Sequence, residues 1–202
     1  MSAYRPLFTG DVVADVPIPG VQSTGRAIVL AHPCSIRGRD AKLVDSILMG
    51  AVEDHDPVAA HKWEHGFLNR MPLPELDDVE GSFSVARLDR LGLAATTSIQ
   101  GAERIACLSP LGVNLLQQRL VAHLTRAEIP TATFWEAFGH TYEEADLLEE
   151  WTEELADDDL DAAAMEFETW IRTDTRQSRL MDPQLRASVR SAMRTEIRRR
   201  RS

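Results

Sequence analysis

The sequence has few of the residues and motifs on which several protein classes depend. Only two of its 202 residues, Cys34 and Cys107, are cysteine, which predicts free thiols in a reducing compartment rather than a disulfide framework. No apolar run approaches the roughly 18 residues of a membrane-spanning helix, and the amino-terminal residues lack a signal-peptide core. No phosphate-binding loop, dinucleotide fingerprint or nucleophile elbow occurs. We therefore expect a soluble cytoplasmic protein with no membrane association.

Lysine is also scarce, and the charge is polarised along the chain. Lysine supplies two of the 22 basic residues, and the formal net charge is -10. Residues 127–174 hold 16 acidic residues and one arginine, whereas residues 175–202 hold nine arginines and two acidic residues. The net charge argues against a general nucleic-acid coat protein, because phosphate binding needs a cationic surface. The arginines of the final stretch could bind phosphate, pair with the neighbouring acids or meet a partner's acidic surface.

The first half of the sequence has the pattern of short strands. Apolar runs alternate with turn-forming residues, and most connections are too short for crossover helices. The runs predict strands at 12–16, 27–31, 43–52, 82–86 and 104–108, with a short helix inserted near 57–69. We therefore expect residues 1–108 to form a small β-barrel.

The second half has helical periodicity. Ser109 and Pro110 form a helix start, after which Val113, Leu116, Leu120 and Leu124 recur on one face. Capping-box patterns predict further helices beginning near residues 133 and 141. The fold class is thus predicted to be α+β, with a barrel followed by an α-helical region over residues 109–202.

The last predicted helix begins near residue 182 and carries an apolar stripe. Its members are Leu185, Val189, Met193 and Ile197, at four-residue spacing. A freely solvated nucleic-acid tail would not need such a stripe. We therefore expect this helix to dock through the four side chains while its arginines face acidic surface, either of the preceding helices or of a partner.

Two further groups of residues could carry chemistry. Four potential metal ligands, His32, Cys34, His61 and His65, lie in two short segments. Their spacing matches no standard zinc module, and the alternative is a polar helix face beside a buried thiol, so we assign no metal and no cofactor. Cys34 could instead be an activated thiol, with His32 and nearby arginines lowering its pKa, although such a cysteine usually serves packing.

Several short pieces follow one another in a particular order. They are Gly10-Asp11-Val12-Val13, then Gly25-Arg26 leading into Ile28-Val29-Leu30, an apolar run at 43–52, and the helix start at Ser109-Pro110. In this order they resemble the MazF/PemK family of toxin endoribonucleases, over roughly half of the chain.

The resemblance implies an SH3-like barrel, RNA as substrate and a toxin–antitoxin context. It also implies a role for Arg26, which matches the family arginine that opens the second strand and stabilises the scissile phosphate. A threonine near the end of the third strand also works in that family. The corresponding stretch here reads Met49-Gly50-Ala51-Val52 and carries no hydroxyl.

Two classes of function therefore stand. The first, which the incomplete catalytic set favours, is a non-catalytic binding or regulatory module that docks a protein partner through the stripe from Leu185 to Ile197. The second is RNA cleavage, with Arg26 at the phosphate and with Arg26, Arg37 and Arg39 binding the RNA. Either form could act as an oligomer.

Overall fold

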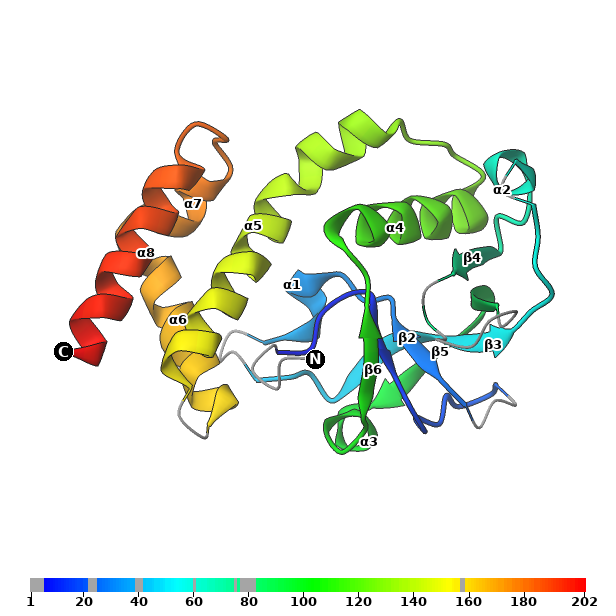
Figure 1. Cartoon of the computed structure of the whole chain (residues 1–202), viewed down its shortest axis with the longest axis horizontal. Helices are drawn as coiled ribbons and strands as arrows, with labels where there is room; N and C mark the ends of the chain where they lie inside the picture. Colours follow the sequence, from blue (N-terminus) through cyan, green and yellow to red (C-terminus); the bar gives the residue numbers. More distant parts are fainter. Residues whose placement is uncertain are drawn as a thin grey trace.

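A half-barrel of β-strands is followed by a helical region. The computed structural model describes residues 6–21, 25–38, 42–59, 61–74, 76, 83–156 and 159–202. Its amino-terminal part is a six-stranded antiparallel sheet that curls into a half-barrel, and the remainder is helical (Figure 1). The α+β class is therefore confirmed. Among the described helices, none combines the length and apolarity needed to cross a bilayer.

The sheet has two outer strands that do not pair with each other. Its strands are β1 (Asp11–Val13), β2 (Ala27–Val29), β3 (Ser46–Asp54), β4 (Arg70–Leu73), β5 (Ser84–Ala95) and β6 (Arg104–Cys107). They run in the order β4-β5-β3-β2-β1-β6, each antiparallel to its neighbour. Because β4 and β6 lie at opposite edges of the described sheet, the expected barrel is open along one seam.

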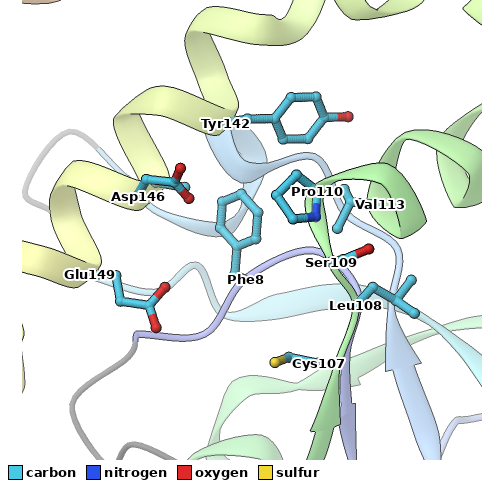
Figure 2. Close-up of a pocket in the computed structure, with 10 residues that line it drawn as sticks. Phe8, Cys107, Leu108, Ser109, Pro110, Val113, Tyr142, Asp146 and Glu149 are labelled. Atoms are coloured by element: carbon cyan, nitrogen blue, oxygen red, sulfur yellow. The ribbon is translucent and has the colours of Figure 1, made fainter. Parts of the chain in front are cut away.

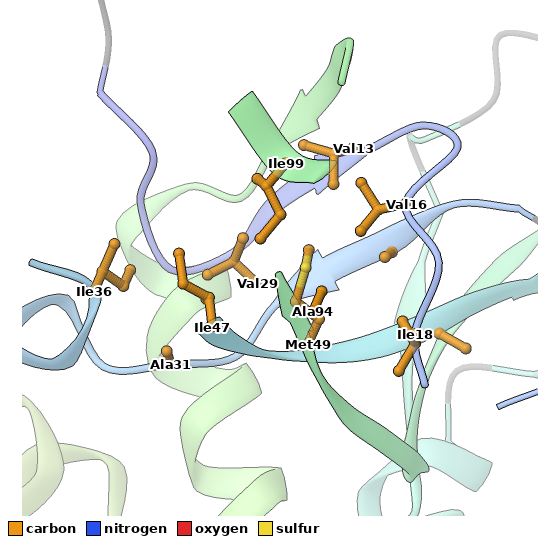
Figure 3. Packing of buried hydrophobic residues seen from close by; sticks show 12 residues of the cluster. Val13, Val16, Ile18, Val29, Ala31, Ile36, Ile47, Met49, Ala94 and Ile99 are labelled. Atoms are coloured by element: carbon orange, nitrogen blue, oxygen red, sulfur yellow. The ribbon is translucent and has the colours of Figure 1, made fainter. Parts of the chain in front are cut away.

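Alternating side chains build a core on each face of the sheet. In β2, Ala27 and Val29 belong to one apolar cluster and Ile28 to the other, as the two-residue period of a strand requires. The first cluster is completed by Ile36 of α1 (Pro33–Ile36) and Ile99 of α3 (Thr96–Gln100) (Figure 3). The second cluster includes Leu116 of α4 (Pro110–Thr125).

Two elements between residues 57 and 73 differ from the sequence-based expectation. The helix expected over 57–69 is reduced to α2 (Lys62–His65), and Phe67 adopts a left-handed conformation with φ of 55° shortly after it. The chain then enters β4, which had not been predicted. This strand contains Pro72, a residue tolerated at the edge of a sheet because that position needs no ladder donor on one side.

The helical region consists of one long helix and several shorter ones packed on it. After α4 come α5 (Thr131–Leu155), α6 (Leu160–Arg172), the 3-10 turn η1 (Thr173–Thr175), α7 (Arg176–Leu180) and α8 (Arg186–Arg201). Ser109 caps α4 by accepting from the Gly112 N–H at 3.2 Å, as its sequence predicts. The helix start predicted near 133 agrees with α5, which begins at Thr131, whereas the start predicted at 141 is wrong because α5 continues through that position.

The core of the helical region joins α5, α6 and α8. Trp151, Phe167 and Met193 are fully buried there, with the Trp151 and Phe167 rings 5.9 Å apart in an edge-to-face arrangement. Figure 1 shows α8, which ends near the carboxyl terminus, lying beside α5 and α6 on the far side from the sheet.

Candidate functional site

Arg26 lies at one end of the sheet, where three neighbouring strands bring polar residues together. It directly precedes β2, and its carbonyl accepts from the Val52 N–H of β3 at 2.8 Å. Its Nη2 donates to Asp54 Oδ1 at 2.5 Å and to Ser84 Oγ at 3.0 Å. Because β3 lies between β2 and β5, the end of β3 and the start of β5 meet the start of β2. This is the Arg26 cluster: Arg26, Asp54 and Ser84.

The Arg26 cluster pairs an arginine with a hydroxyl, but the charge is balanced. Asp54 is 85% exposed, so its ion pair with Arg26 is screened by water and contributes about 1 kcal/mol or less. A phosphate would therefore have to replace an exposed carboxylate on Arg26 rather than meet an unpaired guanidinium. The Ser84 side chain is fully buried, which keeps its hydroxyl from bulk solvent.

A polar ladder extends from this cluster along β3 and β5. Arg87 donates to Glu53 at 2.9 Å and to Asp89 at 2.8 Å, and Arg90 also donates to Glu53. The Asn69 amide donates to Asp89 at 2.9 Å. These hydrogen bonds, that from Arg87 above all, hold the pKa of Asp89 well below its usual range. The ladder pairs its charges internally, as a structural network does.

The imidazole nearest to this region is occupied at both nitrogens. His55 Nδ1 donates to the Asp56 carbonyl at 2.6 Å, and Nε2 accepts from Arg70 Nη1 at 2.5 Å. Since an arginine can only donate, these contacts fit a neutral imidazole protonated on Nδ1. His55 would have to release Arg70 before it could take a proton from a substrate.

Arg37 does not join Arg26 in the described structure. Arg37 follows α1, past the end of β2 opposite to Arg26, and it lines a pocket of about 200 Å³ together with Glu168 of α6. Burial lowers its pKa, while the carboxylates of Asp161 and Glu168 oppose that shift. Arg37 thus faces the acidic helices of its own chain. Arg39 lies outside the described residues.

The four potential metal ligands are only partly described. His32 is half-buried after β2, where burial and the neighbouring His140 of α5 lower its pKa. His61 is exposed beside α2. The side chains of Cys34 and His65 lie outside the described set. Among the side chains that are described, no group of three or more His, Cys, Asp or Glu residues could hold a metal ion.

The apolar stripe of the last helix packs inside the chain. Val189, Met193 and Ile197 are buried against α5, α6 and α7, while Leu185 precedes the helix and remains partly exposed. The acidic surface opposite the arginines is supplied by α5 and α6. Arg190 donates to Glu143 at 2.9 Å and to Glu150 at 3.0 Å, and Arg200 and Arg201 pair with Glu166 and Glu154.

This packing changes the assignment of the stripe as a partner-binding surface. Three of its four side chains are used within the chain, so they have no accessible area to offer a partner. Arg199, Arg200 and Arg201 are likewise paired with the chain's own acids. The sequence alone does not say whose acidic surface the arginines meet, because the same apolar stripe and the same charges are expected for a surface of this chain and for a surface of a partner.

A groove along α4, which we call the α4 groove, was not predicted from the sequence. The α4 groove has a volume of about 710 Å³ and runs between α4 and the two outer strands of the sheet. Leu111 and Leu115, which line it from α4, are 56% and 40% exposed. Its other walls include Met71, Leu73, Ala106 and Arg119.

Arg119 stands at one end of the α4 groove. Its guanidinium donates to the carbonyl oxygens of Trp63 at 2.5 Å, Arg70 at 3.1 Å and Phe67 at 3.3 Å, and lies 5.7 Å from the Trp63 ring centroid. Burial lowers its pKa, and no described carboxylate pairs with it. The groove therefore combines exposed apolar walls with a half-buried positive charge.

A smaller pocket lies between the start of α4 and the middle of α5. It has a volume of about 340 Å³, and Figure 2 shows Phe8 between Tyr142 and the acidic side chains of Asp146 and Glu149. Burial raises the pKa of the Tyr142 phenol to about 12, and its hydroxyl donates to Gln117 at 3.3 Å. Asp146 lies 3.9 Å from Arg190, so the acidic rim is linked to the α8 charge network.

Comparison with known proteins adds no family to these observations. No protein-family model matches the chain, and no curated protein is similar enough to be matched to it. Function must therefore be argued from the site geometry alone.

Proposed function

We propose that the chain is a non-catalytic binding module that docks a protein partner in the α4 groove. The observation that carries this proposal is the exposure of Leu111 and Leu115 on one face of α4, above a groove of about 710 Å³. Single exposed leucines are ordinary, but neighbouring ones along a concave apolar surface are typical of interaction sites. The SH3-like assignment of the half-barrel belongs to this proposal as well.

The charge distribution supports a protein partner over RNA. The net charge is -10, and four arginines of α8 pair with glutamates of α5 and α6 in the same chain; they are Arg190, Arg194, Arg200 and Arg201. RNA binding depends on an unpaired cationic surface, which attracts the phosphates and releases their counterions. A protein segment that binds by burying apolar area does not need an unpaired cationic surface.

The experiment compares groove variants in partner capture. Tagged wild-type chain, a Leu111→Asp/Leu115→Asp double variant and a Leu124→Asp control are used to capture proteins from a lysate of the source cells. Leu124 lies on the same helix and is 62% exposed, but it does not line the groove. We expect a protein held by wild type and Leu124→Asp and lost by the double variant. A partner retained equally by all three would refute groove docking.

A second candidate function, RNA cleavage, is favoured by one specific contact. Arg26 donates to Ser84 Oγ at 3.0 Å, so β5 supplies a hydroxyl beside the arginine, whereas residues 49–54 at the end of the third strand carry none. In this proposal the guanidinium would stabilise the negative charge that builds on the phosphate, a contribution of up to about 3 kcal/mol in a dry site. Asp54 would have to leave Arg26 when the phosphate binds.

Incubation with a mixed RNA pool tests this second function. Arg26→Ala should lower turnover by about 100-fold, the rate equivalent of nearly 3 kcal/mol. Arg90→Ala is the matched control, because Arg90 is a partly exposed arginine that pairs with Glu53 and does not contact the Arg26 cluster. Absence of turnover by the wild type, or equal turnover by wild type and Arg26→Ala, would reject this function.

A further inference from the structure

We propose that the segment bound in the α4 groove carries an Asp or Glu side chain that pairs with Arg119, beside apolar residues that cover Leu111 and Leu115. This inference rests on the proposed docking function and names the chemistry of the partner. It follows from the positions of the three α4 residues, from the state of the Arg119 guanidinium and from the composition of the groove walls.

Leu111, Leu115 and Arg119 form one continuous stripe on α4. Residues four apart on an α-helix lie on the same face, about 6 Å apart along the axis, so the stripe spans about 12 Å. All three residues line the groove. A segment lying along α4 therefore meets two leucines and then a guanidinium, in that order.

Arg119 retains capacity for an anion. A guanidinium has five N–H donors, and the described contacts of Arg119 use carbonyl oxygens only, those of Trp63, Phe67 and Arg70. Carbonyl dipoles orient the group without neutralising its charge. Because burial already lowers the pKa of Arg119, the charged form is kept at a solvation cost that a carboxylate would offset.

The surroundings select an acid flanked by apolar residues rather than a free anion. Among the described residues that line the groove, all side chains other than those of Arg119, Ser109 and Cys107 are apolar or aromatic, including Trp63, Met71 and Leu73. Burial of a carboxylate there is favourable only when the rest of the segment covers these walls and excludes water from the ion pair. An inorganic phosphate cannot provide that apolar cover.

Selection from a phage-displayed library of random peptides against the full chain tests the proposal. Selected peptides should share apolar residues next to Asp or Glu. Replacing that acid by its amide should weaken binding by about 10- to 100-fold, as expected for a charge-assisted hydrogen bond, measured by fluorescence anisotropy. The penalty should shrink in Arg119→Gln and persist in Leu124→Asp.

A second measurement covers the case in which Arg119→Gln does not fold, since Arg119 also ties three carbonyl groups. On the wild-type chain, a peptide with Lys in place of the acid should bind more weakly than the amide peptide, with a difference that falls as salt rises. If peptides bind in a manner sensitive to Leu111→Asp and show no preference for an acid, the inference is wrong and the docking function stands. If no peptide is enriched, or binding ignores Leu111→Asp, both are wrong.

Discussion

The Met193→Ala substitution should lower the free energy of unfolding of the helical region more than truncation of an exposed methionine does, because Met193 packs α8 against the neighbouring helices. Its side chain is 0% exposed and belongs to the cluster with Trp151 and Phe167. Truncating a buried methionine removes transfer free energy and leaves a cavity, at a cost of about 3 kcal/mol. For a chain of this size that cost corresponds to a fall in melting temperature of about 6 to 12 °C.

Met181→Ala is the matched control for this prediction. Met181 is 66% exposed just after α7, so its truncation should change the free energy of unfolding by less than about 0.5 kcal/mol. Urea denaturation followed by circular dichroism at the helix band measures both variants. Equal unfolding free energies for Met193→Ala and Met181→Ala would refute the docking of α8 through its apolar stripe.

Three further predictions concern the sheet and its contact with the helices. Gly92→Ala should lower the unfolding free energy by about 1 to 3 kcal/mol, since its Cβ would lie 2.9 Å from a backbone carbonyl oxygen, whereas Gly101→Ala, facing open space, should be neutral in the same denaturation assay. Asp89→Asn should destabilise the fold at neutral pH by about 1 kcal/mol, because the lowered pKa of Asp89 gives stability that is present above its unfolded pKa and lost on acidification. A difference in unfolding free energy between variant and wild type that does not change with pH would contradict this. Burial raises the pKa of Glu144, so the stability tied to its neutral form is present below the usual carboxyl pKa and is lost as the pH rises. Glu144→Gln should therefore unfold at a higher urea concentration than wild type at neutral pH. The difference between the two midpoints should vanish below about pH 4.

The helical half could be predicted well because its signals are local. The cap at Ser109 and the burial of Val113 and Leu116 follow from spacing within one helix. Leu124, at the end of the same stripe, is exposed, so the periodicity alone does not show how far along α4 the packing continues. Capping boxes within α5 were overridden, because packing of the continuous helix outweighs about 1 kcal/mol of a local cap.

The candidate sites could not be predicted, because they depend on which strands become neighbours. Ser84 reaches Arg26 only since β3 lies between β2 and β5, an order that joins residues 58 positions apart. No pattern in the sequence says which strand lies beside the segment that carries Ser84. The α4 groove likewise needs β4, a strand that was not predicted, to end the sheet opposite β6.

The polarity of charge along the chain is best understood as an intramolecular device. Arg190 bridges Glu143 and Glu150, with side chains that are all largely shielded from solvent, so the positive helix and its acidic neighbours form one packed unit. Because those charges are engaged, they add little to the field that an approaching molecule meets beyond the net charge of -10. Arg119 differs from Arg190, since its described hydrogen bonds all go to carbonyl oxygens and it lines an apolar groove. A search for the partner should therefore begin at the α4 groove rather than at the arginine-rich terminus.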